Sequence, residues 1–540
     1  MSTANFSAAA SPIASTKAQP LSLDPVASEY ARNQGSRCAI YTWSAAQIAV
    51  IFILLELLLY VALYDAHLLA AIVFSCIAGA LLFIASFRLL LIVLSLLDNP
   101  QATVSQQDID LIDRATLPPY TILVPLYKES KIASGIVAAL GKLDYPRHLL
   151  DIKLILEADD DTTIAAINAI SLSPEFHVIM LPPSLPRTKP KACNHGLLSA
   201  RGEYVVIFDA EDRPDFDQLL KAVAVFRSRS FEFDCAQAKL NFYNPRDNFL
   251  TRSFTIEYTI WFDLVLPGIQ RLKGPIPLGG TSNHFRTANL RKLGGWDPFN
   301  VTEDCDLGVR LATAGCSTTL LDSTTWEEAN GALGNWLRQR SRWSKGYMQT
   351  HLVHTRNPIS LVQSLGVKST ALLFLCVSSV PFQHIMNGVC LPMTFTYGVL
   401  LFADVIDGRS VWTVIAGSPD EYRIAWKLLY LENGNALGWA LFSLAGFLAS
   451  VAMLLANFLF ILIALIACRQ RRNRDLWTTA LASPIYWLLA SVASWKGFVQ
   501  LVTRPHYWEK TTHGQSIVEP LEHACVTSDS QQVEVRKSRS

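Results

Sequence analysis

The sequence lacks the features of several common protein classes. Its 46 Lys and Arg residues are nearly balanced by 45 Asp and Glu residues, so the basic surplus of a nucleic-acid-binding protein is absent. The ten cysteines form no Cys-x-x-Cys pair and no metal-ligand spacing, and several lie in apolar stretches, as reduced and buried thiols do. No repeat of fixed period is found. Residues 1–36 are rich in Ala and Ser and lack the order of a cleaved signal peptide, so we expect a disordered cytosolic tail there.

Long apolar runs lie at both ends of the chain. At 540 residues, 51% of them hydrophobic, the chain is too long and too apolar to be one soluble domain. The runs 45–64 and 68–97 each reach the roughly 20 residues that a bilayer-spanning helix needs, which predicts two transmembrane helices within residues 37–99. Further runs at 369–402, 435–467 and 476–502 predict about four more spans within residues 356–505.

The order of these runs leaves the topology undecided. If the polar segment after the last run lies on the same side as the central region, an even number of spans must separate the two. The arginine-rich stretch 469–474 would then lie outside, against the positive-inside rule. Three spans would move the arginines inside but separate the polar segment from the central region. We expect about six crossings in all, and a re-entrant segment at 381–392 or within 476–502 is the alternative that satisfies both conditions.

Between these ends, residues 100–355 have the composition of a soluble α/β domain. Short apolar runs predict strands at 120–126, 151–156, 177–181 and 204–208, with helical stretches between them. Strands that alternate with helices imply a mainly parallel, doubly wound sheet. The second and fourth strands end in acidic clusters, which we therefore expect on one edge of the sheet, where such sheets carry their active sites.

The acidic cluster after the fourth strand contains Asp209, Glu211 and Asp212. Hard oxygen ligands at one strand end suit Mg²⁺ or Mn²⁺ holding a diphosphate. An isolated acidic triplet is more often a solvated turn, so the metal site depends on the neighbouring motifs.

Two of those motifs suit a nucleotide diphosphate that carries a transferable group. Asp159 and Asp160 follow the second strand, where they can accept hydrogen bonds from a base or ribose. Lys189 or Lys191, at the start of a helical stretch, can neutralise phosphate charge.

Two later motifs suit the transfer itself. Glu303 and Asp304 precede a helical stretch, and a carboxylate there can take a proton from an attacking hydroxyl, although an acidic helix cap is the more common use. Gln339, Arg342 and Trp343 offer a diphosphate clamp and a flat surface for a sugar ring, but such residues are also ordinary on a helix at a membrane interface. Each motif is weak alone, and their order along the chain is the specific signal.

This ordered set resembles the membrane-embedded family 2 glycosyltransferases, the group that contains cellulose, curdlan, chitin and hyaluronan synthases. The resemblance covers residues 118–350 closely and the flanking helices in layout. It rests on the run Val124-Pro-Leu-Tyr-Lys-Glu129, the pair Asp159-Asp160, the cluster Asp209-Ala-Glu-Asp212, the triplet Thr302-Glu-Asp304 and the motif Gln339-x-x-Arg-Trp343.

The resemblance implies an α/β GT-A domain inserted between transmembrane α-helices, on the cytosolic face of the plasma (inner) membrane. It implies a UDP-sugar donor, with UDP-glucose favoured, and Mg²⁺ or Mn²⁺. By this resemblance Asp304, next to Glu303, is the catalytic base, Arg342 with Gln339 contacts the diphosphate, and Trp343 stacks on the acceptor sugar. An acceptor hydroxyl attacks C1 from the face opposite UDP and forms a β-linkage without a covalent enzyme intermediate.

One motif departs from the family pattern. The Asp-x-Asp metal pair of the family reads Asp209-x-Glu211 here. Because Glu is one methylene longer, the choice of ligands among Asp209, Glu211 and Asp212 stays open.

Two further segments fit the same resemblance. In the loop 279–286, glycines and the polar Asn283 and His284 suit closure around the acceptor, and a plain strand connection is the alternative. In the segment 506–514, Trp508, Lys510 and Thr511 are similar to the residues that cover the nucleotide in cellulose and hyaluronan synthases, which predicts a gate. An aromatic and basic interface anchor is the alternative. We expect residues 515–540 to form a disordered tail.

The first functional hypothesis is a processive β-glucan synthase that threads its growing glycan through its own helices. The alternative is a non-processive membrane glycosyltransferase that makes a glycolipid. A transporter or inactive scaffold is a third reading, which predicts broken acidic motifs, whereas every expected carboxylate is present.

Overall fold

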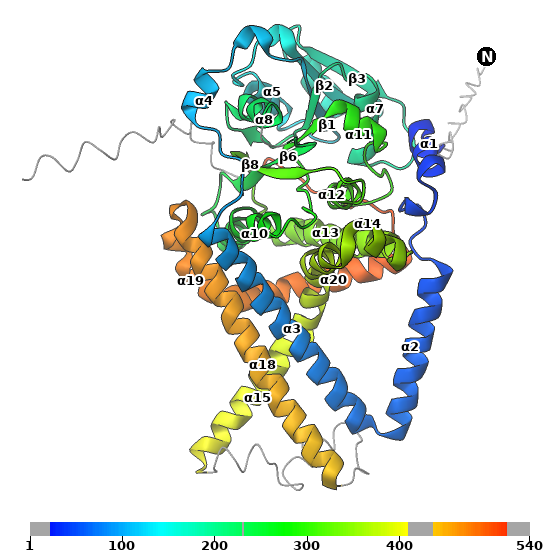
Figure 1. Ribbon diagram of the computed structural model, residues 1–540, viewed down its shortest axis with the longest axis vertical. Helices are drawn as coiled ribbons and strands as arrows, with labels where there is room; N and C mark the ends of the chain where they lie inside the picture. Colours follow the sequence, from blue (N-terminus) through cyan, green and yellow to red (C-terminus); the bar gives the residue numbers. More distant parts are fainter. Residues whose placement is uncertain (1–21, 229–231, 409–435, 516–540) are drawn as a thin grey trace, which may run out of the picture.

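The computed structural model describes residues 22–228, 232–408 and 436–515, which form an α/β domain and a set of long apolar helices (Figure 1). The domain lies at one end of the molecule, and four helices run away from it toward the other end. These helices are α2 (Ala45–Tyr64), α3 (Ala66–Leu97), α15 (Ser379–Ile406) and α18 (Ala436–Arg469). The expected tails at 1–21 and 516–540 lie outside the described residues.

An eight-stranded mixed sheet forms the centre of the domain. Its strands are β1 (Tyr120–Leu126), β2 (Leu150–Glu157), β3 (Phe176–Leu181), β4 (Tyr204–Ile207), β5 (Arg213–Pro214), β6 (Cys235–Phe242), β7 (Asn283–Arg286) and β8 (Thr318–Glu327). The order is β3-β2-β1-β4-β7-β6-β8-β5, and the first four strands are parallel to one another. β7 is antiparallel to both β4 and β6, so the expected parallel order holds for only half of the sheet. The expected α/β class is confirmed.

Helices cover both faces of the sheet, and each face has its own hydrophobic core. Ile122 and Val124 of β1 belong to the core with α5 and α8, whereas Leu123 belongs to the core with α7 and α12. Successive residues of a strand point to opposite faces, which explains this division. The helices of the domain are α4 (Gln106–Asp110), α5 (Ala133–Leu140), α6 (Asp161–Asn168), α7 (Lys189–Leu198), α8 (Gln218–Phe226), α11 (Thr287–Lys292), α12 (Glu303–Thr313) and α13 (Leu333–His354).

A continuous helical segment joins the domain to the long helices. It consists of α9 (Phe249–Tyr258), the π-helical stretch Thr259–Val265 and α10 (Leu266–Arg271). Gly268 approaches α3 so closely that a Cβ atom there would lie 2.3 Å from the carbonyl oxygen of Leu91. Glycine is needed at this position because the two backbones are in contact.

Within the described residues, five helices are long and apolar enough to cross a membrane. Not all of them run away from the domain. α20 (Ser483–Thr503) lies along α13 at the base of the domain (Figure 1). α14 (Pro358–Leu373), which is the first part of the apolar run that continues into α15, packs against α12. Because an apolar helix can also bury its side chains against another helix, these helices do not by themselves give the number of crossings, and about six crossings stays a prediction.

The position of α20 bears on the conflict in topology. Arg471, just after α18, donates to both carboxylate oxygens of Asp263 in the domain, at 2.6 and 3.0 Å. Because α20 stays beside α13, the segment 506–514 that follows it lies against the domain as well. The arginine-rich stretch and this segment therefore both contact the domain.

The last part of the expected disordered tail is folded. Asp24 accepts hydrogen bonds from the N–H groups of Val26 and Ala27, at 3.0 and 3.1 Å, and so caps α1 (Pro25–Gln34). Asp at the cap followed by Pro at the first helical position is a common helix start. Residues 22–36 therefore correct the expectation, and the sequence carried the signal for it.

Candidate active site

A cavity of about 350 Å³ lies at the carboxyl ends of β1, β2 and β4 and extends between the long helices. Most of the candidate residues line it, although they come from distant parts of the chain: Lys189, Asp209, Glu211, Glu303, Asp304, Gln339, Arg342, Trp343, Trp508 and Lys510. The parallel strands bring the polar residues together, because their carboxyl ends meet at one edge of the sheet.

The acidic turn after β4 divides its carboxylates between the cavity and the interior. Asp209 forms an ion pair with Lys189, and Glu211 lies 3.1 Å from Nδ1 of His513. Asp212 is 1% exposed and accepts hydrogen bonds from the Asp209 N–H, at 2.7 Å, and from the hydroxyl of Thr281. Asp209 and Glu211 thus face the cavity, whereas Asp212 holds the turn in shape.

Negative charge accumulates at this turn. Burial, together with the charge of Asp209, raises the pKa of Glu211 to about 7. The pKa of Glu327, which also lines the cavity, is raised by burial and by the charges of Asp212 and Glu211. Within the described residues, no three acidic, His or Cys side chains converge as a complete metal site. The carboxylates fit a divalent cation that takes one or two protein ligands and completes its shell with phosphate oxygens and water.

Glu303 and Asp304 begin α12 and point into the same cavity. Burial raises the pKa of Asp304 to about 6, and burial with the charge of Asp304 raises that of Glu303 to about 8. A Cβ atom at Gly280 would lie 3.4 Å from Oδ2 of Asp304, so the glycine loop passes directly beside this carboxylate. A carboxylate with a raised pKa in a cavity suits proton transfer better than simple capping of a helix.

The long helix α13 supplies a cationic and aromatic wall. The Arg342 guanidinium lies 5.0 Å from the ring centre of Trp508, and its Nε has no hydrogen-bond partner among the described residues. Burial lowers the pKa of Arg342, although the charge of Glu303 opposes this effect. Trp343 packs against Phe254, with ring centres 5.6 Å apart. Gln339 accepts a hydrogen bond from Asn330 at 3.3 Å.

Several sequence candidates have other surroundings. Asp159 pairs with Arg187 at 2.5 Å, beside the cavity. Asp160 caps α6 by accepting from the N–H of Thr163 at 3.3 Å, and the fully buried Lys191 pairs with Glu157 at 2.7 Å. None of these three candidates lines the cavity.

The two acceptor candidates of β7 are also buried. His284 is 0% exposed and shares a 2.7 Å hydrogen bond with the hydroxyl of Tyr120, and the side chain of Asn283 donates to the Gly279 carbonyl at 2.6 Å. Neither lines the cavity. This position does not fit the expectation that the two residues contact an acceptor, because residues 283–286 of this segment form the central strand β7.

Among the residues that line the cavity and that sequence reasoning missed are Glu129, Glu157, Arg187 and His513. Arg187 and His513 lie next to motifs that were recognised, and Glu129 ends the recognised run Val124–Glu129. These neighbouring motifs were the signal in the sequence that could have identified the residues. The buried Glu157 Oε2 has no hydrogen-bond partner among the described residues, which marks this carboxylate as a possible ligand contact.

The segment after α20 crosses the mouth of the cavity. Lys510 forms an ion pair with Glu129, next to β1, and the carbonyl of Thr512 accepts from Asn335 of α13 at 2.7 Å. Thr511 is 1% exposed, and its hydroxyl has no partner among the described residues. The segment thus spans from the sheet to α13 and contacts Glu211 through His513. A gating role remains a prediction.

The α/β domain thus carries carboxylates, cations and aromatic rings at one edge of its sheet. Residues 118–346 match the family model described as "Glycosyltransferase like family 2". The match covers the α/β domain, in agreement with the glycosyltransferase motifs of the sequence.

Curated relatives match a part of the chain. The chain is 29% identical over 237 residues to "Probable glycosyltransferase YdaM" of Bacillus subtilis, a match that covers 43% of this chain and 55% of the relative. It is 27% identical over 247 residues to "Beta-monoglucosyldiacylglycerol synthase" of Synechocystis sp., over 44% of this chain and 50% of the relative. The chain thus spans about half the length of the curated relatives it matches.

Among solved structures, the mannosyltransferase PcManGT from Pyrobaculum calidifontis, in complex with GDP-Man and Mn²⁺, aligns with a TM-score of 0.42 and 20% identity. The alignment covers 71% of this chain and 99% of that one.

Proposed function

We propose that the protein is an inverting membrane glycosyltransferase that transfers a sugar from a UDP-sugar to a lipid hydroxyl. One observation carries this proposal: the cavity that contains Asp209 and Asp304 continues between the apolar helices, where Phe460, Ile463 and Trp487 line it. A polar donor can bind among the charged residues of this cavity while an apolar acceptor reaches it from between the helices. The β-monoglucosyldiacylglycerol synthases among the relatives support a lipid acceptor.

The donor belongs at the sheet edge. Asp209 and Glu211 would hold Mg²⁺ or Mn²⁺, which supplies positive charge for the leaving diphosphate. Lys189 and Arg342 add positive charge from the opposite walls of the cavity. Asp159, positioned by Arg187 at the rim, is the candidate for the uridine contact.

Asp304 is the proposed base. Its carboxylate takes the proton of the acceptor hydroxyl while the hydroxyl oxygen forms a bond to C1 of the sugar. The bond from C1 to the diphosphate oxygen breaks, and its electron pair leaves with UDP. Because attack and departure occur on opposite faces, an α-linked donor gives a β-linked product. Trp343 offers the surface on which the acceptor group rests.

The topology follows from the position of the arginines. We propose that α2, α3, α15 and α18 cross the plasma (inner) membrane, and that α14 and α20 lie at its cytosolic surface. This arrangement places the domain and the stretch 469–474 on the cytosolic side, in agreement with the positive-inside rule. It also gives the domain access to UDP-sugars and leaves residues 506–514 free to cover the bound donor.

A processive β-glucan synthase is the second candidate function, with glucose from UDP-glucose as the monomer. It is favoured by the aromatic residues in the lining of the cavity. Trp261 and Trp487 would stack on the sugar rings of a glycan that leaves between the helices.

The test is to incubate the purified protein in nanodiscs with UDP-sugars, Mg²⁺ or Mn²⁺, and diacylglycerol, and to measure UDP release and size the labelled product. We expect a small product that is extracted with the lipid, whose yield depends on added diacylglycerol. High-molecular-weight material sensitive to β-glucanase, formed without added lipid, would replace this proposal with the polymer synthase. Absence of turnover with every donor would favour an inactive scaffold.

A further inference from the structure

The segment that precedes the first apolar helix connects two separate parts of the active site. We propose that residues 22–40, here called the N-terminal strap, position both the loop 182–189 on the donor side and the helix that carries Asp304. The kinetic consequences rest on the proposed function, whereas the structural consequences can be measured without it.

The first end of the strap pairs with the donor loop. The N–H of Asp24 donates to the Leu185 carbonyl at 2.7 Å, and the N–H of Leu185 donates to the Ser22 carbonyl at 2.9 Å. The Asp24 carboxylate, 1% exposed, accepts from the hydroxyl of Ser184 at 2.9 Å and lies 3.0 Å from Nε2 of His195. Because buried polar groups need their partners, these bonds fix the loop in one position.

The loop held in this way carries the cations of the donor site. Arg187 pairs with Asp159 at 2.5 Å, and Lys189, at the start of α7, pairs with Asp209 and donates to the Gly280 carbonyl at 2.6 Å. Only a few residues of backbone separate these cations from Leu185, so a shift of the loop moves them relative to the acidic turn.

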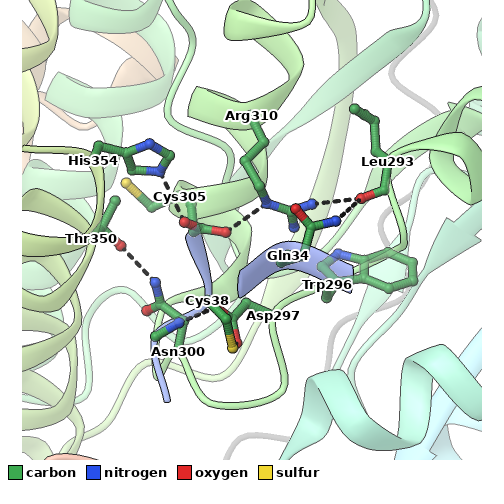
Figure 2. Close-up of polar contacts among 12 residues, drawn as sticks. Gln34, Cys38, Leu293, Trp296, Asp297, Asn300, Cys305, Arg310, Thr350 and His354 are labelled. Atoms are coloured by element: carbon green, nitrogen blue, oxygen red, sulfur yellow. Dashed lines mark hydrogen bonds and ion pairs between the residues drawn. The ribbon is translucent and has the colours of Figure 1, made fainter. Parts of the chain in front are cut away.

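The second end of the strap holds the loop before α12 (Figure 2). The N–H of Ala39 donates to Oδ2 of Asp297 at 2.6 Å, and the N–H of Phe299 donates to Oδ1 at 2.9 Å. Asp297 is fully buried, and Sγ of Cys38 lies 3.6 Å from its Oδ1. The side chain of Gln34 donates to the Leu293 carbonyl at 3.3 Å.

A buried network of hydrogen bonds and ion pairs links this loop to the helix that carries the base. Arg310 of α12 donates to the same Leu293 carbonyl at 3.1 Å and to Asp306 at 2.8 Å, and Asp306 in turn lies 2.9 Å from Nε2 of His354 at the end of α13 (Figure 2). Asp304 lies two residues before Asp306. The strap-bound loop, α12 and α13 are therefore held as one unit around the base.

The two ends of the strap should have different kinetic effects. Loosening the donor loop should weaken UDP-sugar binding, whereas loosening the loop before α12 should misplace the base and reduce turnover. Since residue 45 begins the apolar helix α2, the strap also joins the membrane part of the chain to both loops.

The experiment compares three variants by hydrogen exchange and steady-state kinetics. Asp24→Ser keeps a helix cap but is too short to reach Ser184 and His195. Asp297→Asn replaces one of two oxygens that each accept a backbone N–H, so one of those bonds is lost. Arg32→Ala, at an exposed position of the strap, is the matched control.

We expect Asp24→Ser to speed exchange in residues 182–189 and to raise the KM for UDP-sugar several-fold with little change in kcat. Asp297→Asn should speed exchange in residues 293–301 and lower kcat at least tenfold with the donor KM unchanged. If Asp297→Asn does not fold, Gln34→Ala, which removes only the bond to the Leu293 carbonyl, takes its place. Arg32→Ala should match the unaltered protein.

Exchange that is unchanged in both loops, or the same kinetic defect in both variants, would overturn the proposal. If the unaltered protein transfers no sugar at all, the proposed function fails, and the exchange measurements alone decide whether the strap positions the two loops.

Discussion

Replacing Asp304 by Asn should remove activity and increase stability at the same time. The substitution keeps the shape of the side chain but removes the group that accepts the proton. Positioned bases contribute about 10² to 10⁴ in rate, or about 3 to 5 kcal/mol of barrier, so kcat should fall by that factor. UDP binding, measured by calorimetry, should change little because Asp304 accepts from the N–H of Cys305 at 2.8 Å, and the Coulombic effects of Lys189 and Asp209 on it have opposite signs.

The stability gain follows from the raised pKa. Burial raises the pKa of Asp304 to about 6, against an ordinary value of about 3.9. Ionising this group at pH 7 therefore costs the folded state up to about 3 kcal/mol, a cost that Asn does not have. Since the penalty appears as the pH rises from about 4 to 6, the variant should have the higher melting temperature at pH 7 and match the unaltered protein near pH 4.

The same pKa predicts how activity depends on pH. Because the base acts in its ionised form, kcat/KM of the unaltered protein should fall about tenfold per pH unit below about 6. The assays are sugar transfer and thermal unfolding in one detergent, with Asp110→Asn as an exposed control. An active Asp304→Asn enzyme would refute the assignment of the base, and a less stable one would refute the electrostatic reasoning.

Three other predictions concern the acceptor, the metal and the packing of the helices. Trp343→Ala should raise the KM for the acceptor about tenfold while the affinity for UDP stays the same, and an unchanged acceptor dependence would remove the stacking role. Chelation with EDTA should abolish turnover, and Mg²⁺ or Mn²⁺ should restore it in the unaltered protein but much less in Glu211→Ala; full activity in EDTA would contradict the metal assignment. Gly268→Ala should lower the free energy of unfolding by about 1 to 3 kcal/mol, because its Cβ would lie 2.3 Å from the Leu91 carbonyl oxygen. Thermal unfolding tests this last effect, and an unchanged melting temperature would show that α3 and α10 can separate.

Much of the domain could be predicted because local patterns specified it. The expected strands at 120–126, 151–156, 177–181 and 204–208 are short, mostly apolar runs, and each forms a strand of the sheet. The remaining strands β5 to β8 were not foreseen. Strand β7 holds the polar pair Asn283-His284, and the buried His284 finds its partner in the distant Tyr120, so the sequence of this strand does not indicate a buried strand.

The apolar runs predicted hydrophobic helices but not their direction. α20 has the length and composition of a membrane span, yet it lies along α13. Packing against another helix buries apolar side chains as a bilayer does, and hydropathy alone does not separate the two. The contact between Arg471 and Asp263 supplies the missing information, because it fixes which side of the helices the arginine-rich stretch occupies.

By itself, the sequence determined the α/β class, the order of the acidic motifs and the pairing of a soluble domain with apolar helices, because each depends on residues that are neighbours in the chain. The tertiary structure alone decided which candidates share a cavity. It turned Asp212, Lys191 and His284 inward, brought His513 to Glu211 from the other end of the chain, and attached the N-terminal strap to both loops. These outcomes depend on contacts between distant segments, which no local pattern of residues specifies.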